Sequence, residues 1–191
     1  MPADGPLTPR QTRWFAAVRA GLETATGLSL AQWAERARAC PEQGRRRQLA
    51  WMKSVHGLGQ NHASIVLNAA FPERATWAEP ETLGNTLWAD PAQAALFAAV
   101  RNAAEALDTV VSTQRKAFSA FSRNVQFAAA RPLRQGGIMV GLAVAPEADP
   151  RLVVRGRESW SERLSASMAV NDAHTIDTAF TALLRAAWER S

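Results

Sequence analysis

The residues with the clearest chemistry lie around a pair of glycines, Gly57 and Gly59, that flank Leu58. Apolar side chains precede and follow this triplet at the spacing typical of a helix-hairpin-helix turn. Glycine lets a backbone turn with positive φ, and it lets a phosphate approach without a Cβ in the way. A helix that begins after the turn presents unpaired N–H groups and the positive end of its dipole, and both favour an anion. The pattern therefore predicts a nucleic-acid phosphate contact at Gly57, Leu58, Gly59, Gln60 and Asn61.

The same triplet also has a purely structural interpretation, because turns with two glycines are common between packed helices. Asn61 stands where strong phosphate-binding hairpins often carry a lysine or an arginine, so we expect weak affinity. His56 and His62 flank the turn six residues apart, which is not the same-face spacing of two zinc ligands on one helix. We expect them to cap or solvate the turn, and we expect no metal site.

Positive charge gathers in the same half of the chain. The formal net charge is +5, and residues 1–75 hold ten basic side chains against five acidic ones, so the whole excess lies there. This is the sign that a nucleic-acid partner requires. Arg45, Arg46, Arg47 and Lys53 precede the turn and join the predicted site, although a solvated arginine-rich helix face is the alternative.

A second basic stretch, residues 109–146, contains no acidic residue. Its cations alternate with Phe118, Phe121 and Phe127, and basic and aromatic groups interleaved on a sheet can hold single-stranded nucleic acid. The alternative is that the phenylalanines are core and the cations form the polar face of a half-exposed sheet. The cations of this stretch are Arg115, Lys116, Arg123, Arg131 and Arg134.

No group of residues predicts catalysis or a bound cofactor. Cys40 is the single cysteine, so it cannot form an internal disulfide, and it has no evident base to activate it. Glu158 and Glu162 would share a face if their segment were helical, but three arginines surround them and we expect local salt bridges. We therefore expect a protein that is not an enzyme and holds no cofactor.

The elements that must position these residues fall into two groups, which predict an α+β fold. Cap signals and helical spacing indicate an all-α domain over residues 8–74, with four helices near 8–26, 29–39, 44–54 and 60–70. Residues 75–191 are expected to form a second domain, an antiparallel sheet flanked by helices.

In that second domain, residues 83–88 resemble a connecting segment, and Asp90 caps a helix that ends near residue 107. Short apolar or alternating stretches follow, and Gly136-Gly137 gives a hairpin signal between two of them. The expected strands are 110–115, 117–122, 125–132, 138–145 and one within 160–170, before a last helix that follows Asp177.

The chain shows no signal for a membrane or for export. The longest apolar run lies within residues 138–145 and is too short to cross a bilayer. Residues 1–10 lack the basic-then-apolar order of a secretory signal, and a single cysteine suits a reducing compartment. We expect a cytoplasmic protein with no membrane partner.

Several of these residues together resemble a bacterial two-domain arrangement known only as domains of unknown function. The N-terminal likeness covers about residues 12–70 and rests on Thr26 to Leu30, Trp33 and Trp51 to Gly59. The C-terminal likeness covers about residues 85–190 and rests on Gln114 to Phe118, Gln126 to Ala128, Gly141-Leu142 and the Asp177 helix. The resemblance implies no activity.

The hairpin alone is similar to that of base-excision DNA glycosylases, but no aspartate follows it in a matching context and no cysteine cluster exists for an iron–sulfur centre.

These observations favour a non-enzymatic, cytoplasmic nucleic-acid-binding protein, with DNA the favoured partner and weak, largely sequence-nonspecific contacts. The alternative is a protein-interaction or small-ligand-binding module whose C-terminal sheet forms the pocket, with a purely structural hairpin. A protein partner or self-association stays open under either hypothesis.

Overall fold

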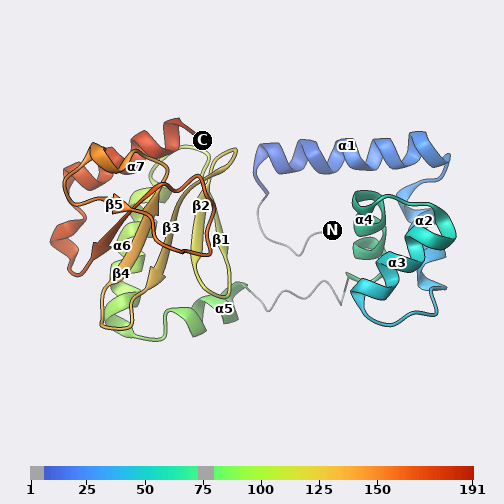
Figure 1. The fold of residues 1–191 in the computed structure, drawn as a ribbon, viewed down its shortest axis with the longest axis horizontal. Helices are drawn as coiled ribbons and strands as arrows, with labels where there is room; N and C mark the ends of the chain where they lie inside the picture. The colour runs from blue at the N-terminus through green and yellow to red at the C-terminus, as the bar shows by residue number, and fades with distance from the viewer. Residues whose placement is uncertain (1–6, 73–79) are drawn as a thin grey trace. The chain divides into compact units, whose positions relative to one another are not determined.

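The computed structural model describes residues 7–72 and 80–191, which form two compact units (Figure 1). The described parts of these units are mainly residues 11–72 and 80–191. The expected domain junction between residues 74 and 75 lies outside the described residues. The predicted α+β class is confirmed, with helices in the first unit and helices with an antiparallel sheet in the second.

The first unit consists of four helices, as expected from the sequence. They are α1 (Pro9–Thr26), α2 (Leu30–Arg38), α3 (Arg45–His56) and α4 (Gln60–Ala70). Helix α2 begins with the predicted capping box, in which Ser29 accepts from the Gln32 N–H and the Gln32 side chain accepts from the Ser29 N–H. The core of the first unit contains the fully buried side chains of Leu22, Met52 and Val66, and α2 and α3 both pack on α4.

The second unit is built on a six-stranded antiparallel sheet with the order β1-β2-β3-β4-β6-β5. Helices α5 (Pro80–Leu87) and α6 (Pro91–Glu105) precede the sheet, and α7 (Thr178–Glu189) follows it. The strands are β1 (Val111–Gln114), β2 (Ser119–Ser122), β3 (Gln126–Pro132), β4 (Ile138–Leu142), β5 (Val153–Val154) and β6 (Ala166–Val170). The predicted hairpin between β3 and β4 is present, and both Gly136 and Gly137 have positive φ.

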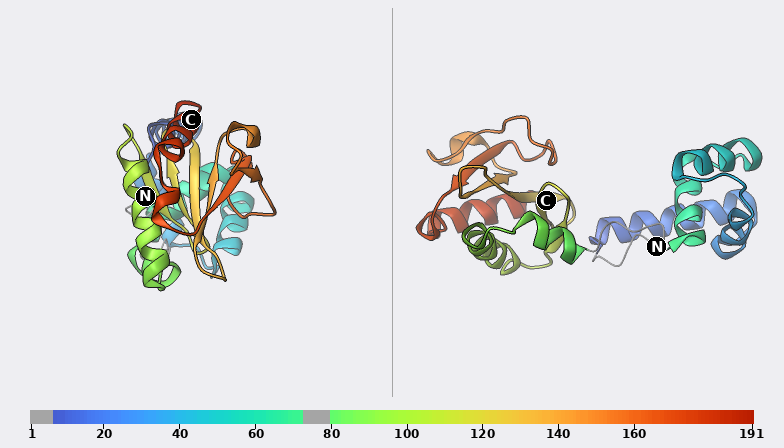
Figure 2. Two further views of the ribbon diagram at one scale, coloured as in Figure 1. Left: turned by 90° about the vertical axis from the view of Figure 1, so that its left-hand side faces the viewer. Right: turned by 90° about the horizontal axis from the view of Figure 1, so that it is seen from below.

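Helices α6 and α7 pack against each other on one face of the sheet (Figure 2). Because side chains alternate along a strand, Val140 and Leu142 of β4 point into this helix-covered core, and Gly141 points to the opposite face. A Cβ on Gly141 would come within 2.8 Å of the Trp160 ring. Only glycine therefore lets Trp160 lie directly on the strand.

One local expectation is wrong, and two details of the strands and loops were not expected. Residues 83–88 are not a connector, because most of them belong to α5. The strand expected within residues 160–170 is present as β6, which begins at Ala166, and the short strand β5 was not expected. Residues 158–162 are not helical, so Glu158 and Glu162 do not share a helix face. Among the described residues, no helix is both long and apolar enough to cross a membrane.

Candidate nucleic-acid interface

The turn between α3 and α4 closes on Gly57, which has the left-handed conformation with φ 67°. Its N–H donates to the Lys53 carbonyl at 3.0 Å, and the Leu58 N–H donates to the Met52 carbonyl at 3.2 Å. The Leu58 side chain is 3% exposed and fills the core beneath the turn. Gly57 and Leu58 therefore shape the turn and anchor it, as in other left-handed helix ends.

Gly59 has a different part in the turn. We expected positive φ at both glycines, but Gly59 is extended, with φ −65° and ψ 162°, and it is the N-cap of α4. Any residue can adopt this conformation. A Cβ on Gly59 would meet no atom within 4 Å, so the backbone here is open to the approach of a ligand.

Helix α4 begins without a side-chain cap. The N–H groups of Gln60, Asn61 and His62 therefore have no partner within the helix. The side chains of Gln60 and Asn61 are exposed, so the first turn of α4 presents backbone donors beside two polar side chains. Donors and dipole together make this turn a suitable place for an anion.

The two histidines do not behave as expected. The ring of His56 lies edge-on to Trp33 and to Trp51, with centroid distances of 5.4 Å and 4.7 Å, so it packs rather than solvates the turn. The Nε2 atom of His62 lies near Gly21 of α1, 3.5 Å from where a Cβ would be. Within residues 7–72 and 80–191, no cluster of three or more His, Cys, Asp or Glu side chains could hold a metal ion.

The basic residues of α3 divide into three kinds. Lys53 is exposed in the last turn, next to Gly57. Arg46 and Arg47 are exposed in the first turn, about 15 Å from Gly57 at 1.5 Å per residue. Arg45 donates from Nη2 to the Ser64 carbonyl at 3.0 Å, and burial lowers the pKa of its guanidinium. Arg45 thus joins α3 to α4, and Lys53 is the α3 cation nearest to the turn.

The basic stretch of the second unit does not form one surface. Arg115 and Lys116 lie in the turn between β1 and β2, and Arg123 lies in the turn at the opposite end of β2. The Arg123 guanidinium stacks on Trp188 at 4.1 Å from the ring centroid. Arg131 forms two hydrogen bonds with Glu158, at 2.7 Å and 2.8 Å. We expected Glu158 to pair with a neighbouring arginine, but its partner lies 27 residues away in the sequence.

The aromatic side chains of this stretch do not offer faces for base stacking. Phe121 and Phe127 are fully buried. Phe118 is half-buried and meets Trp160 edge-on, at a centroid distance of 6.3 Å. The structure therefore agrees with the alternative stated for these rings, which is that they belong to the core.

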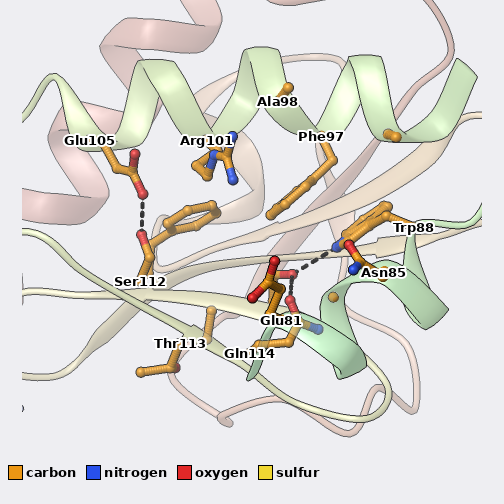
Figure 3. A pocket seen from close by; sticks show the side chains of 15 residues that line it. Glu81, Asn85, Trp88, Phe97, Ala98, Arg101, Glu105, Ser112, Thr113 and Gln114 are labelled. Atoms are coloured by element: carbon orange, nitrogen blue, oxygen red, sulfur yellow. Dashed lines mark hydrogen bonds between the residues drawn. The ribbon is translucent and has the colours of Figure 1, made fainter. Parts of the chain in front are cut away.

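The second unit contains a cavity of about 460 Å³ that the sequence patterns did not predict (Figure 3). Helices α5 and α6 form one side of this cavity and strands β1 and β2 form the other. Its lining includes Glu81, Arg101 and Gln114, none of which belongs to the predicted site. The sequence carries little signal for this cavity, because residues 83–88 resemble a connecting segment, whereas most of them belong to α5, which contributes one wall.

Two family models match the chain. One is described as a domain of unknown function (DUF4287) and matches residues 14–70, and the other is described as a domain of unknown function (DUF5655) and matches residues 85–191. These matches confirm the resemblance to two domains of unknown function. No curated protein and no solved structure matches the chain.

Proposed function

Because the chain belongs to the family described as domain of unknown function (DUF5655), whose description names no activity, we propose a function from the candidate interface itself. The protein is a non-enzymatic nucleic-acid-binding protein that contacts backbone phosphates through its Gly57-Leu58-Gly59 turn. DNA is the favoured partner. The expected bacterial and cytoplasmic setting is part of this proposal, and the single thiol of Cys40 suits it.

One observation carries the proposal: the uncapped first turn of α4 lies beside a glycine whose backbone is unobstructed. Phosphate oxygens can accept from the N–H groups of Gln60 and Asn61 while the chain approaches Gly59 closely. Lys53 supplies an exposed cation in the last turn of α3, next to the same turn. Backbone donors alone bind anions weakly in water, and the lysine adds a charge that the donors lack.

The charge of the first unit supports the same proposal. Its described part, residues 11–72, holds eight basic side chains and three acidic ones. One of those basic groups, Arg38, pairs with Glu35 in the same helix. Arg46 and Arg47 lie far enough along α3 to meet other phosphates of the same strand, so the contact extends along the backbone.

No base-reading element supports sequence recognition, because the contacts at the turn all suit phosphates. Binding is therefore largely sequence-nonspecific and falls as salt rises, since each neutralised phosphate releases a counterion. Fluorescence anisotropy with labelled DNA oligonucleotides at two salt concentrations tests this. Salt-sensitive binding that is similar for unrelated sequences supports the proposal, and no binding at low salt overturns it.

A further inference from the structure

The cavity in the second unit lies between α5 and α6 and the helix-covered face of β1 and β2 (Figure 3). Two small residues of α6, Ala94 and Ala98, line it where these elements approach one another. Their short side chains leave about 460 Å³ unfilled, which is the lower part of the range for small-molecule sites.

A chain of hydrogen bonds fixes one wall of this cavity. The Trp88 Nε1–H donates to Ser119 Oγ at 2.9 Å, and the Ser119 hydroxyl donates to Gln114 Oε1 at 2.7 Å. The Gln114 amide nitrogen donates to the Arg115 carbonyl at 2.7 Å. Trp88 and Ser119 are both buried. The wall is therefore rigid and its polar atoms are paired, as preorganised ligand sites require.

Aromatic rings supply the apolar part of the lining. Trp88 and Phe97 stack in parallel at 4.2 Å between centroids, and Phe97 and Phe121 follow at 6.3 Å. Figure 3 shows the Phe97 ring below α6 with the Trp88 ring next to it. The Trp88 and Phe97 rings cover each other's facing sides. A ligand would therefore contact ring edges and other apolar surface, and it could not stack between the two rings.

Two opposite charges at this cavity have no ion-pair or hydrogen-bond partner among the described residues. Arg101 of α6 makes no ion pair or hydrogen bond there, and its guanidinium lies 5.8 Å from the Phe97 centroid. Glu81 of α5 likewise has no such partner within residues 7–72 and 80–191. Glu105, one helical turn after Arg101, accepts instead from the Ser112 hydroxyl at 2.6 Å. In Figure 3 the Arg101 and Glu81 side chains both reach into the space between the helices and the strands.

We propose that this cavity binds a small zwitterion with an apolar body, of the size of an amino acid. The carboxylate of the ligand pairs with Arg101, its ammonium group pairs with Glu81, and its apolar side chain lies against Phe97 and Trp88. Arg101 and Glu81 line the same cavity from two different helices beside an apolar aromatic surface, so a ligand that carries a carboxylate, an ammonium group and a hydrocarbon side chain can meet all three. This site is separate from the nucleic-acid contact, and neither depends on the other.

Titration of the full chain with L-phenylalanine, followed by ¹⁵N–¹H NMR, tests the proposal. We expect shifts at Arg101, Ser112 and Gln114. Two analogues each carry one of the two charges: 3-phenylpropionate has the carboxylate and 2-phenylethylamine has the ammonium group. Each analogue should bind at least about tenfold more weakly than L-phenylalanine, since one charge-assisted contact is lost.

Two variants then assign the charges. R101Q should weaken the binding of L-phenylalanine and of 3-phenylpropionate and leave the affinity for 2-phenylethylamine unchanged. E81Q should weaken the binding of L-phenylalanine and of 2-phenylethylamine and leave the affinity for 3-phenylpropionate unchanged. Both side chains are exposed, so neither change should unfold the chain. R185Q removes an exposed arginine of α7 outside the cavity lining and serves as the control. Absence of binding at millimolar ligand, shifts away from the cavity, or equal effects of both variants on both analogues would overturn the proposal.

Discussion

Arg131 of β3 and Glu158, 27 residues further along the chain, form an ion pair with two hydrogen bonds. The Arg131 Nε–Glu158 Oε2 distance is 2.7 Å and the Nη2–Oε1 distance is 2.8 Å. This geometry holds the segment that carries Trp160 against the sheet. Hydrogen bonds from Arg131 lower the pKa of Glu158 below its ordinary value of 4.5, so the carboxylate form is favoured in the folded state.

We expect E158Q to lower the free energy of unfolding by about 1 kcal/mol, because it removes one charge of a partly exposed pair and leaves Arg131 without its counterion. E162Q changes an exposed carboxylate four residues later and should have no effect. Urea denaturation at pH 7 measures both. The difference between wild type and E158Q should shrink as the pH falls below 4.5, since the lowered pKa stabilises the fold only while the unfolded carboxyl is ionised. Equal stability of E158Q and wild type at pH 7 would contradict a stabilising pair.

The loop before β5 contains a second ion pair whose contribution to stability should depend on pH. Asp149 accepts from the side chain and the backbone N–H of Arg151, and these hydrogen bonds lower the pKa of Asp149 to about 2. A depressed folded pKa gives stability that is complete above the ordinary value of 3.8 and is lost as the pH falls toward 2. D149N should therefore be less stable than wild type at pH 6, the difference should narrow as the pH falls below 3.8, and the two should converge only below pH 2. E147Q, at an exposed carboxylate two residues earlier, is the control and should follow wild type throughout.

The two glycines of the turn should respond differently to substitution. G57A should cost about 1 kcal/mol of unfolding free energy, because φ 67° is unfavourable for a residue with a Cβ. G59S should instead keep the stability or raise it by a few tenths of a kcal/mol, since serine is a good N-cap and a Cβ there meets no atom. Thermal denaturation of the two variants distinguishes these effects. A comparable loss in G59S would show that Gly59 has a structural requirement that its conformation does not reveal.

Lys53 should contribute to binding without contributing to folding. K53Q should weaken DNA binding and reduce the magnitude of the log–log salt slope by about 1, because one phosphate contact is lost. For wild type we expect a slope of about −2 to −4. K116Q makes the same change in the exposed β1–β2 turn of the second unit. If K116Q lowers affinity and K53Q does not, the contact lies in the second unit.

Features that depend on neighbouring residues were predicted well from the sequence. The capping box at Ser29 and Gln32 and the hairpin at Gly136 and Gly137 each involve groups within four positions of one another. The hydrophobic spacing of long helices and the alternation in the strands also reflect local geometry. The four helices of the first unit and most of the sheet followed from such signals.

Features that depend on distant residues were not predictable. The Arg131–Glu158 pair and the bond from Arg45 to the Ser64 carbonyl join segments whose proximity only the fold creates. Helix α5 is short and contains Gly84, a poor helix former, so its pattern resembled a connector and the cavity beside it went unseen. The turn sequence likewise did not reveal which glycine has positive φ.

The central claim is that the first turn of α4 contacts phosphates, and N61D tests it most directly. A new carboxylate at Asn61 should repel a phosphate and lower DNA affinity about fivefold, as expected for about 1 kcal/mol between unit charges 4 Å apart in water. It should also improve the helix start by about 0.3–1 kcal/mol, so the stability of the fold should hold. Q135E adds the same charge at the exposed β3–β4 turn and should leave affinity unchanged. The decisive measurement is anisotropy with labelled DNA at low salt for wild type, N61D and Q135E: weaker binding by N61D alone is the predicted result, and binding by N61D equal to that of wild type would contradict the claim.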